Sequence, residues 1–123
     1  HMLEADRLEM DRIARSGNHQ GVILKVDPFQ YSSLNELADR AEKKAKAMEA
    51  ANSAAARIAA RPLFIALDSV TDPQNLGAVI RSAAAFGANG VILPERRSAS
   101  VNAAAWKVSA GAAAHMPVAR VVT

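Results

Sequence analysis

The arrangement of hydrophobic and polar positions in the first part of the chain predicts a helix followed by a strand. Residues 3–15 carry apolar side chains among charged ones and end at a turn around Gly17, which is typical of a short amphipathic helix. Residues 22–26 are rich in β-branched side chains and stop before Pro28, so we expect a strand there.

Helical spacing resumes at residue 33. Ser33, with Glu36 three residues later, is typical of a capping box, and the periodicity predicts one long helix that continues to about Ala60. Its second half consists mostly of Ala, Lys and Arg, which favour a helix but offer little surface to bury. We therefore expect an exposed helical connector that marks a domain boundary.

The rest of the chain repeats strand and helix in alternation. The pattern predicts strands at 63–67, 91–93 and 118–122, and helices at 76–86 and 102–108. Gly87 is expected to end the first of these helices. This order predicts an α/β fold with an open parallel sheet, which normally needs further strands to cover its edge.

Composition narrows the class of protein. The 123 residues suffice for one domain or part of a larger one, and the net charge of +3 slightly favours phosphate-bearing partners. The absence of cysteine excludes disulfides and thiolate chemistry. No apolar run is long enough for a membrane helix, so we expect a cytoplasmic protein with no membrane partner. We interpret His1 and Met2 as the remainder of an expression tag.

Ligands of open parallel sheets usually bind at the carboxyl ends of the strands. Here the first core strand is followed by the polar residues Asp68, Asp72, Asn75 and Arg81, and Gly77 would let a ligand or another chain approach closely. Two interpretations stay open. Asn75 and Arg81 form part of a site, or Asn75 only caps the helix and Arg81 only pairs with Asp68 or Asp72.

Other polar and aromatic side chains carry weaker signals. Arg96 and Arg97 follow the next strand and suit phosphate, although two arginines also suit a solvated turn. His19 is a candidate for RNA contact, with a local hydrogen-bonding role favoured. We expect Trp106 to pack in the core or at a dimer contact, and His115 to be structural or exposed. No metal-ligand cluster, Walker loop or Ser/His/Asp set occurs in the sequence, so we expect no metal.

The stretch from residue 67 to residue 87, LDSVTDPQNLGAVIRSAAAFG, resembles the first motif of SpoU (TrmH-like) RNA 2′-O-ribose methyltransferases of the SPOUT superfamily nearly end to end. Further stretches are similar to the subgroup that methylates a guanosine ribose of the large-subunit (23S) ribosomal RNA; they are 91–94, 97–99 and 107–112. Residues 18–22 resemble the end of the small RNA-binding domain that precedes the catalytic domain in that subgroup.

The resemblance implies a knotted α/β fold, a homodimer, S-adenosylmethionine as methyl donor and a ribose 2′-hydroxyl of RNA as acceptor. Asn75 and Arg81 match the functional positions of the motif, and the family assigns the arginine to the target nucleotide. The implied organisation is the end of an RNA-binding domain (3–31), a helical connector (32–61) and the first half of the methyltransferase domain (62–123).

The family's second and third motifs, a glycine-rich turn with a glutamate and a Ser-Leu-Asn segment, are not found up to residue 123. They supply the knot and the donor pocket, so no donor-binding residue can be named here and we expect an incomplete form of the enzyme. The alternative is a non-catalytic RNA-binding or dimerisation module. A nucleotide-binding domain of another family is a weaker option, because no glycine-rich phosphate fingerprint follows either core strand.

Overall fold

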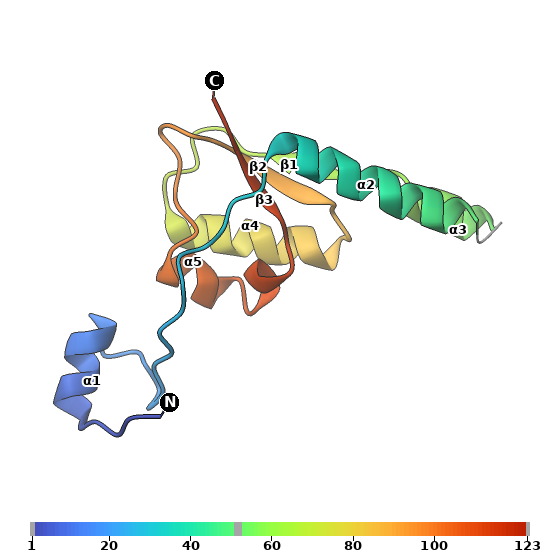
Figure 1. Cartoon of the computed structure of the whole chain (residues 1–123). Helices are drawn as coiled ribbons and strands as arrows, with labels where there is room; N and C mark the ends of the chain where they lie inside the picture. Colours follow the sequence, from blue (N-terminus) through green and yellow to red (C-terminus); the bar gives the residue numbers. More distant parts are fainter. Residues whose placement is uncertain (1, 51–52, 123) are drawn as a thin grey trace.

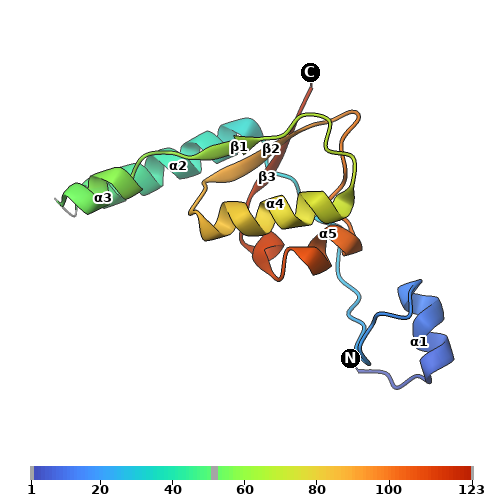
Figure 2. The same ribbon diagram turned by 180° about the vertical axis from the view of Figure 1, so that it is seen from behind.

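A sheet of three parallel strands forms the centre of the molecule (Figure 1). The computed structural model describes residues 2–50 and 53–122, and the strands are β1 (Phe64–Ala66), β2 (Gly90–Pro94) and β3 (Val118–Val121), in that order across the sheet. Helices α4 (Pro73–Ala85) and α5 (Ala103–Val108) and the short 3₁₀ helix η1 (Ala112–Ala114) lie on one side of the sheet, as Figures 1 and 2 show from opposite directions. The predicted open parallel α/β sheet is confirmed.

Helix α4 is fixed to the sheet by one apolar face. Leu76, Ile80 and Ala83 are fully buried and belong to the same core cluster as Val91 and Val118. These positions are three or four residues apart, so they share one side of the helix and leave the opposite side to solvent.

The ends of α4 follow local rules. The Asp72 carboxylate accepts a hydrogen bond from the backbone N–H of Gln74 at 2.9 Å, and Pro73 takes the first helical position, which suits its fixed φ and missing N–H. The helix therefore begins three residues earlier than expected. Gly87 follows its last turn with a φ of 71°, so the predicted glycine end is confirmed.

Gly77 brings α5 into direct contact with α4. A Cβ atom at this position would overlap the carbonyl oxygen of Ala105 and lie 3.0 Å from the Cβ of Val108. The close approach that we expected for a ligand or a second chain is therefore made by α5 of the same chain. This packing leaves no space at Gly77 for a ligand.

Two helices replace the single long helix expected from Ser33 to Ala60. Helix α2 (Leu34–Glu49) begins with the predicted capping box, in which the Ser33 N–H donates to Glu36 at 2.6 Å and lowers the pKa of that carboxyl. Helix α3 (Ala54–Ala59) begins at Ser53, whose hydroxyl accepts from the N–H of Ala56 at 3.0 Å. Because alanine favours a helix at every position here, the sequence pattern does not reveal that Ser53 caps a second helix.

The two helices lie side by side and project from the body of the molecule, with the start of α2 against the sheet on the side opposite α4 (Figures 1 and 2). Leu37 of α2 is fully buried, at a place where a Cβ on Gly90 of β2 would collide with its side chain. None of the helices in the described part of the chain is long and apolar enough to cross a membrane.

The N-terminal segment only partly matches its prediction. Helix α1 (Arg7–Ala14) forms where expected and is capped by Asp6, which accepts from Glu9 N at 2.8 Å. The strand predicted at 22–26 is wrong, because these residues pair with no strand among those described, and Val22 and Leu24 are exposed. A strand is stable only with a hydrogen-bonded neighbour, which periodicity cannot supply.

We predict that Gly77→Ala lowers the free energy of unfolding by about 1–3 kcal/mol, because the added methyl group forces α4 and α5 apart. Helix propensity alone would give a gain of roughly 1 kcal/mol. Urea unfolding separates the two effects. Ser82→Ala, on the exposed side of the same helix, is the control and should change stability by less than about 0.5 kcal/mol. A more stable Gly77→Ala protein would show that the helices do not touch there.

Asp72→Ala should lower the free energy of unfolding by about 1 kcal/mol, because it removes the acceptor that caps α4. Asn75→Ala should change it by less than about 0.5 kcal/mol, since the Asn75 side chain is exposed and bonds to no described residue. Thermal unfolding of the two variants in parallel measures the difference. Equal losses would mean that Asn75 shares the capping role.

Candidate functional site

The carboxyl edge of the sheet is formed by the loops that follow β1 and β2. A backbone hydrogen bond ties these loops together, in which Ala99 N donates to Val70 O at 2.8 Å, and Leu67 N at the start of the first loop donates to Ile92 O of β2 at 3.0 Å. Glu95 N also donates to Val121 O, at the end of β3, at 2.8 Å. The loops therefore form one continuous surface beside the start of α4.

Asn75 and Arg81 lie on the solvent side of α4. Their separation of six residues places them about 120° apart around the helix axis, on the two flanks of the exposed Ala78. Both side chains are exposed, and neither makes a hydrogen bond or ion pair with any residue that the structure describes. They are consequently available to a ligand that approaches this side of the helix.

The structural alternative for these two residues is wrong. The cap of α4 is Asp72, not Asn75. Asp68 accepts a hydrogen bond from the Ser69 hydroxyl at 3.1 Å, and neither Asp68 nor Asp72 is within ion-pair distance of Arg81. Within the described ranges the ion pairs are His19 with Asp11 and Lys46 with Glu42, both remote from this edge.

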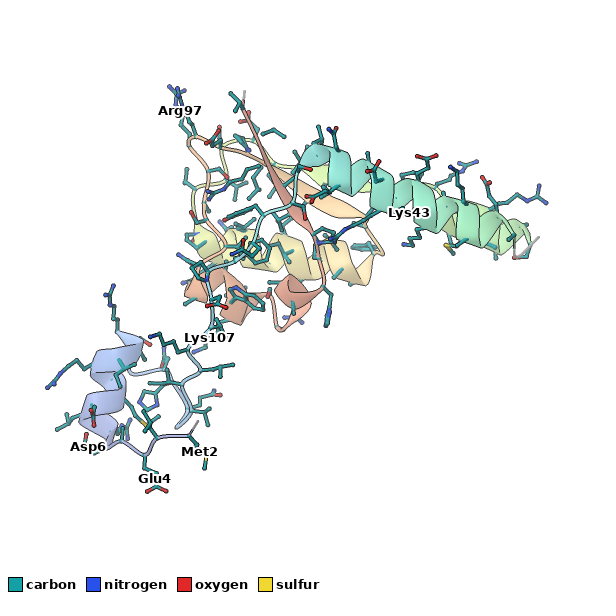
Figure 3. All side chains as sticks on the ribbon, in the orientation of Figure 1. Met2, Glu4, Asp6, Lys43, Arg97 and Lys107 are labelled. Atoms are coloured by element: carbon teal, nitrogen blue, oxygen red, sulfur yellow. The ribbon has the colours of Figure 1, made fainter. Side chains whose placement is uncertain are left out.

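Arg96 and Arg97 occupy the loop after β2, which we call the basic loop and define as residues 95–101. Both are exposed, and Arg97 has a left-handed backbone with a φ of 57°. Figure 3 shows the Arg97 side chain reaching away from the body of the molecule at the same end as the last residues of β3. The loop therefore presents two guanidinium groups to solvent at the carboxyl edge.

Arg120 is a residue that the sequence analysis did not single out. Its Nη2 donates to the Ser100 hydroxyl at 2.9 Å, and its guanidinium carbon lies 4.0 Å from the centre of the Tyr31 ring. The signal in the sequence was a charged residue inside a predicted apolar strand, which is rare unless the charge has a partner. The partner, Tyr31, comes from a distant part of the chain.

His19 lies in the turn after α1 and is used locally. Its Nε2 is 3.0 Å from an Asp11 carboxylate oxygen, its Nδ1 accepts from Gly21 N at 3.0 Å, and its side chain is 8 % exposed. Accepting at Nδ1 places the proton of the neutral ring on Nε2, toward Asp11. The expected local hydrogen-bonding role is confirmed, and contact of His19 with RNA stays a prediction.

The remaining aromatic and histidine candidates also have defined positions. Trp106 packs against the core and makes an edge-on contact with Phe29, with ring centres 6.1 Å apart, so its packing role is confirmed. His115 is exposed. No group of three or more histidine, aspartate or glutamate side chains is placed to hold a metal ion within residues 2–50 and 53–122.

Two cavities lie away from the carboxyl edge. One, of about 420 Å³, is lined by residues of α1 and the turn at 17–21. The other, of about 310 Å³, lies between residues 29–32, the first turns of α2 and residues 113–117, near the start of β3. Neither is lined by Asn75, Arg81 or the basic loop, whose side chains stand on an open surface.

Comparison with known proteins gives consistent matches along the chain. The profile of the SpoU rRNA Methylase family matches residues 62–123, and that of the RNA 2′-O ribose methyltransferase substrate binding family matches residues 1–32. A protein of Mycolicibacterium vanbaalenii described as an uncharacterized tRNA/rRNA methyltransferase is 50% identical over 119 residues, which are 97% of this chain and 33% of that protein. A protein of Mycobacterium ulcerans with the same description is 46% identical over 119 residues, which are 97% of this chain and 34% of that protein.

Among solved structures, the AdoMet-bound rRNA methyltransferase from Sinorhizobium meliloti is similar with a TM-score of 0.54 and 29% identity. The alignment covers 76% of this chain and 29% of that one. The chain thus spans about a third of the length of the curated relatives that it matches. Because a single family profile accounts for β1 to β3 with α4 and the basic loop, the chain belongs to the SpoU rRNA methylase family.

Proposed function

We propose that this chain forms the acceptor side of an RNA methyltransferase that transfers a methyl group from S-adenosylmethionine to a ribose 2′-hydroxyl. The observation that carries the proposal is the orientation of α4, whose buried face leaves Asn75 and Arg81 exposed and unpaired. Membership of the SpoU family and relatives described as tRNA/rRNA methyltransferases support the reaction class. The specific acceptor that we propose is a guanosine of the large-subunit (23S) ribosomal RNA.

Arg81 serves the target nucleotide in this proposal. A guanidinium keeps its proton at all physiological pH values, so it is a poor general base for the 2′-hydroxyl. Its planar set of N–H donors suits a phosphate or a developing oxyanion instead. Asn75, on the neighbouring flank of the helix, offers an amide donor and acceptor that can orient the ribose. We therefore assign binding and charge stabilisation to Arg81 and orientation to Asn75.

Phosphate contacts are proposed for Arg96 and Arg97. Both side chains are exposed on the basic loop, and arginine contacts to phosphate fix the register of a nucleic acid without reading its sequence. The N-terminal segment, residues 3–31, is proposed to bind RNA as the end of a substrate-binding domain, with His19 in the turn that lines the larger cavity. Residues 32–61 connect it to the methyltransferase half.

The methyl donor is not assigned to residues of this chain. When bound, S-adenosylmethionine supplies an electrophilic methyl group. An adenosine needs a concave pocket of several hundred Å³, whereas Asn75 and Arg81 stand on an exposed helix face. The two cavities described above, of about 420 and 310 Å³, do not border Asn75 or Arg81, so neither offers a donor site beside these acceptor residues. We propose that the donor pocket is built by other segments, in a cytoplasmic homodimer of a longer chain.

The second candidate is a non-catalytic RNA-binding or dimerisation module. The observation in its favour is that neither of the two cavities described above borders Asn75 or Arg81. Both candidates predict RNA binding, and only the enzyme predicts methyl transfer that depends on Arg81. The Arg81 variant therefore decides between them.

In the full-length protein, Arg81→Ala should lower the rate of methyl transfer to 23S ribosomal RNA by about 10²–10³-fold, because it removes a donor aimed at the reacting nucleotide. Affinity for S-adenosylmethionine should be unchanged, as measured by calorimetry. Arg57→Ala is the matched control, because it removes the same charge from an exposed position on α3 and should leave the rate unaffected. Wild-type turnover in Arg81→Ala would contradict the assignment, and RNA binding without any methyl transfer by the wild type would favour the module.

A further inference from the structure

Residues 29–32 dock on the free edge of the sheet. Ser32 pairs with Ala119 of β3 in parallel, and its N–H donates to Val118 O at 2.9 Å. This isolated bridge places Ser32 beside β3 at the edge of the sheet. It joins the N-terminal segment to the methyltransferase half. The connection has a fixed register, because a parallel pairing defines which residues face each other.

Tyr31 holds this junction through three contacts. Its hydroxyl oxygen accepts from the backbone N–H of Val101 at 2.9 Å, across 70 positions of sequence. The Arg120 guanidinium stands over its ring at 4.0 Å, and Phe29 meets it edge-on with ring centres 5.1 Å apart. Cation–π and edge-on aromatic contacts favour a single ring orientation. The Tyr31 hydroxyl is therefore held at the end of the basic loop.

The basic loop is fastened at its C-terminal end and open at its tip. Val101 is bonded to Tyr31, the Ser100 hydroxyl accepts from Arg120, and Ala99 N donates to Val70 O. Arg96 and Arg97 are exposed and have no bonded side-chain partner among the described residues. The position of these two arginines thus depends on contacts made a few residues later, one of which comes from the N-terminal segment.

We propose that Tyr31 is a positioning residue that aligns the basic loop with RNA bound to the N-terminal segment. This inference rests on the proposed function. In both Figure 1 and Figure 2 the loop after β2 and the N-terminal segment lie on the side away from the projecting α2 and α3, with the tip of the loop at the upper end of that side and α1 at its lower end. Lys107, which lies between them in Figure 3, donates from Nζ to Asn18 O at 2.6 Å. One RNA strand along this side would meet both parts.

Amide hydrogen exchange of the 123-residue chain tests whether Tyr31 holds the C-terminal end of the basic loop. Tyr31→Phe keeps the ring but removes the acceptor, so the Val101 amide should exchange about 5- to 10-fold faster. Asn89→Ala is the matched control, because Asn89 Oδ1 accepts from Leu63 N at 2.9 Å at the opposite end of the sheet. It should accelerate exchange at Leu63 and leave Val101 unchanged. Unchanged exchange at Val101 in Tyr31→Phe would overturn the proposal.

A double-mutant cycle on RNA affinity separates positioning from general stability. A fluorescent transcript of 23S ribosomal RNA is the probe, at one fixed salt concentration. Tyr31→Phe should weaken binding about 3- to 10-fold in the wild type and have no further effect in the Arg96→Ala, Arg97→Ala background, because coupled residues are non-additive. Asn89→Ala should leave affinity unchanged.

One outcome of the cycle would contradict the positioning role of Tyr31, and another would contradict the proposed RNA-binding function. An equal loss from Tyr31→Phe in both backgrounds would overturn the positioning role while leaving RNA binding intact. Absence of RNA affinity in the wild-type chain would contradict the proposed function and the alignment with RNA, and faster Val101 exchange would then still show that Tyr31 holds the loop.

Discussion

Burial of one face of α4 is the constraint on which the rest of the structure depends. Leu76, Ile80 and Ala83 are fully buried in the core that β2 and β3 share, so the helix has one possible rotation about its axis. Because Gly77 has no side chain, the backbone of α5 can contact α4, and α5 completes the helical layer on this side of the sheet. Asn75 and Arg81 are exposed as a direct consequence, since a helix with one buried face must present its other face outward. Core packing thus determines where the candidate chemistry lies.

The second determinant is the set of contacts between segments that are far apart in sequence. Backbone bonds link the loops after β1 and β2, and Tyr31 links the second of these loops to the N-terminal segment. The parts that we assign to RNA are therefore not independent surfaces. We propose that a change at the junction of residues 29–32 affects the position of Arg96 and Arg97 through the Tyr31–Val101 hydrogen bond. The links made by the Tyr31 side chain are a hydrogen bond and ring contacts, which substitution of this one residue removes.

Much of the fold could be predicted because it depends on local sequence. Strands that alternate with helices imply a parallel sheet, and Ser33 and Gly87 mark helix ends by their own conformational preferences. The prediction of a strand at 22–26 was wrong because a strand also needs a hydrogen-bonded neighbour. The break before α3 was not predicted because the alanines around Ser53 favour a continuous helix.

The candidate site was only partly predictable. The motif singled out Asn75 and Arg81, and spacing alone left open whether Asn75 only caps the helix and Arg81 only pairs with Asp68 or Asp72. The structure shows that Asp72 is the cap and that both side chains are exposed without a partner among the described residues, and their role in a site is our proposal. A charge inside a predicted apolar strand indicates that Arg120 needs a partner, but nothing local to it identifies Tyr31, almost ninety positions away.

The central claim is that this chain carries the acceptor side of a methyltransferase and not the donor side. Titration of S-adenosylmethionine into the purified 123-residue chain, followed by calorimetry, tests it most directly. The account predicts no saturable heat at donor concentrations up to the millimolar range, because we propose that the donor pocket is built by other segments and neither of the two cavities described borders Asn75 or Arg81. A micromolar dissociation constant would contradict it and would place a complete donor pocket within these residues.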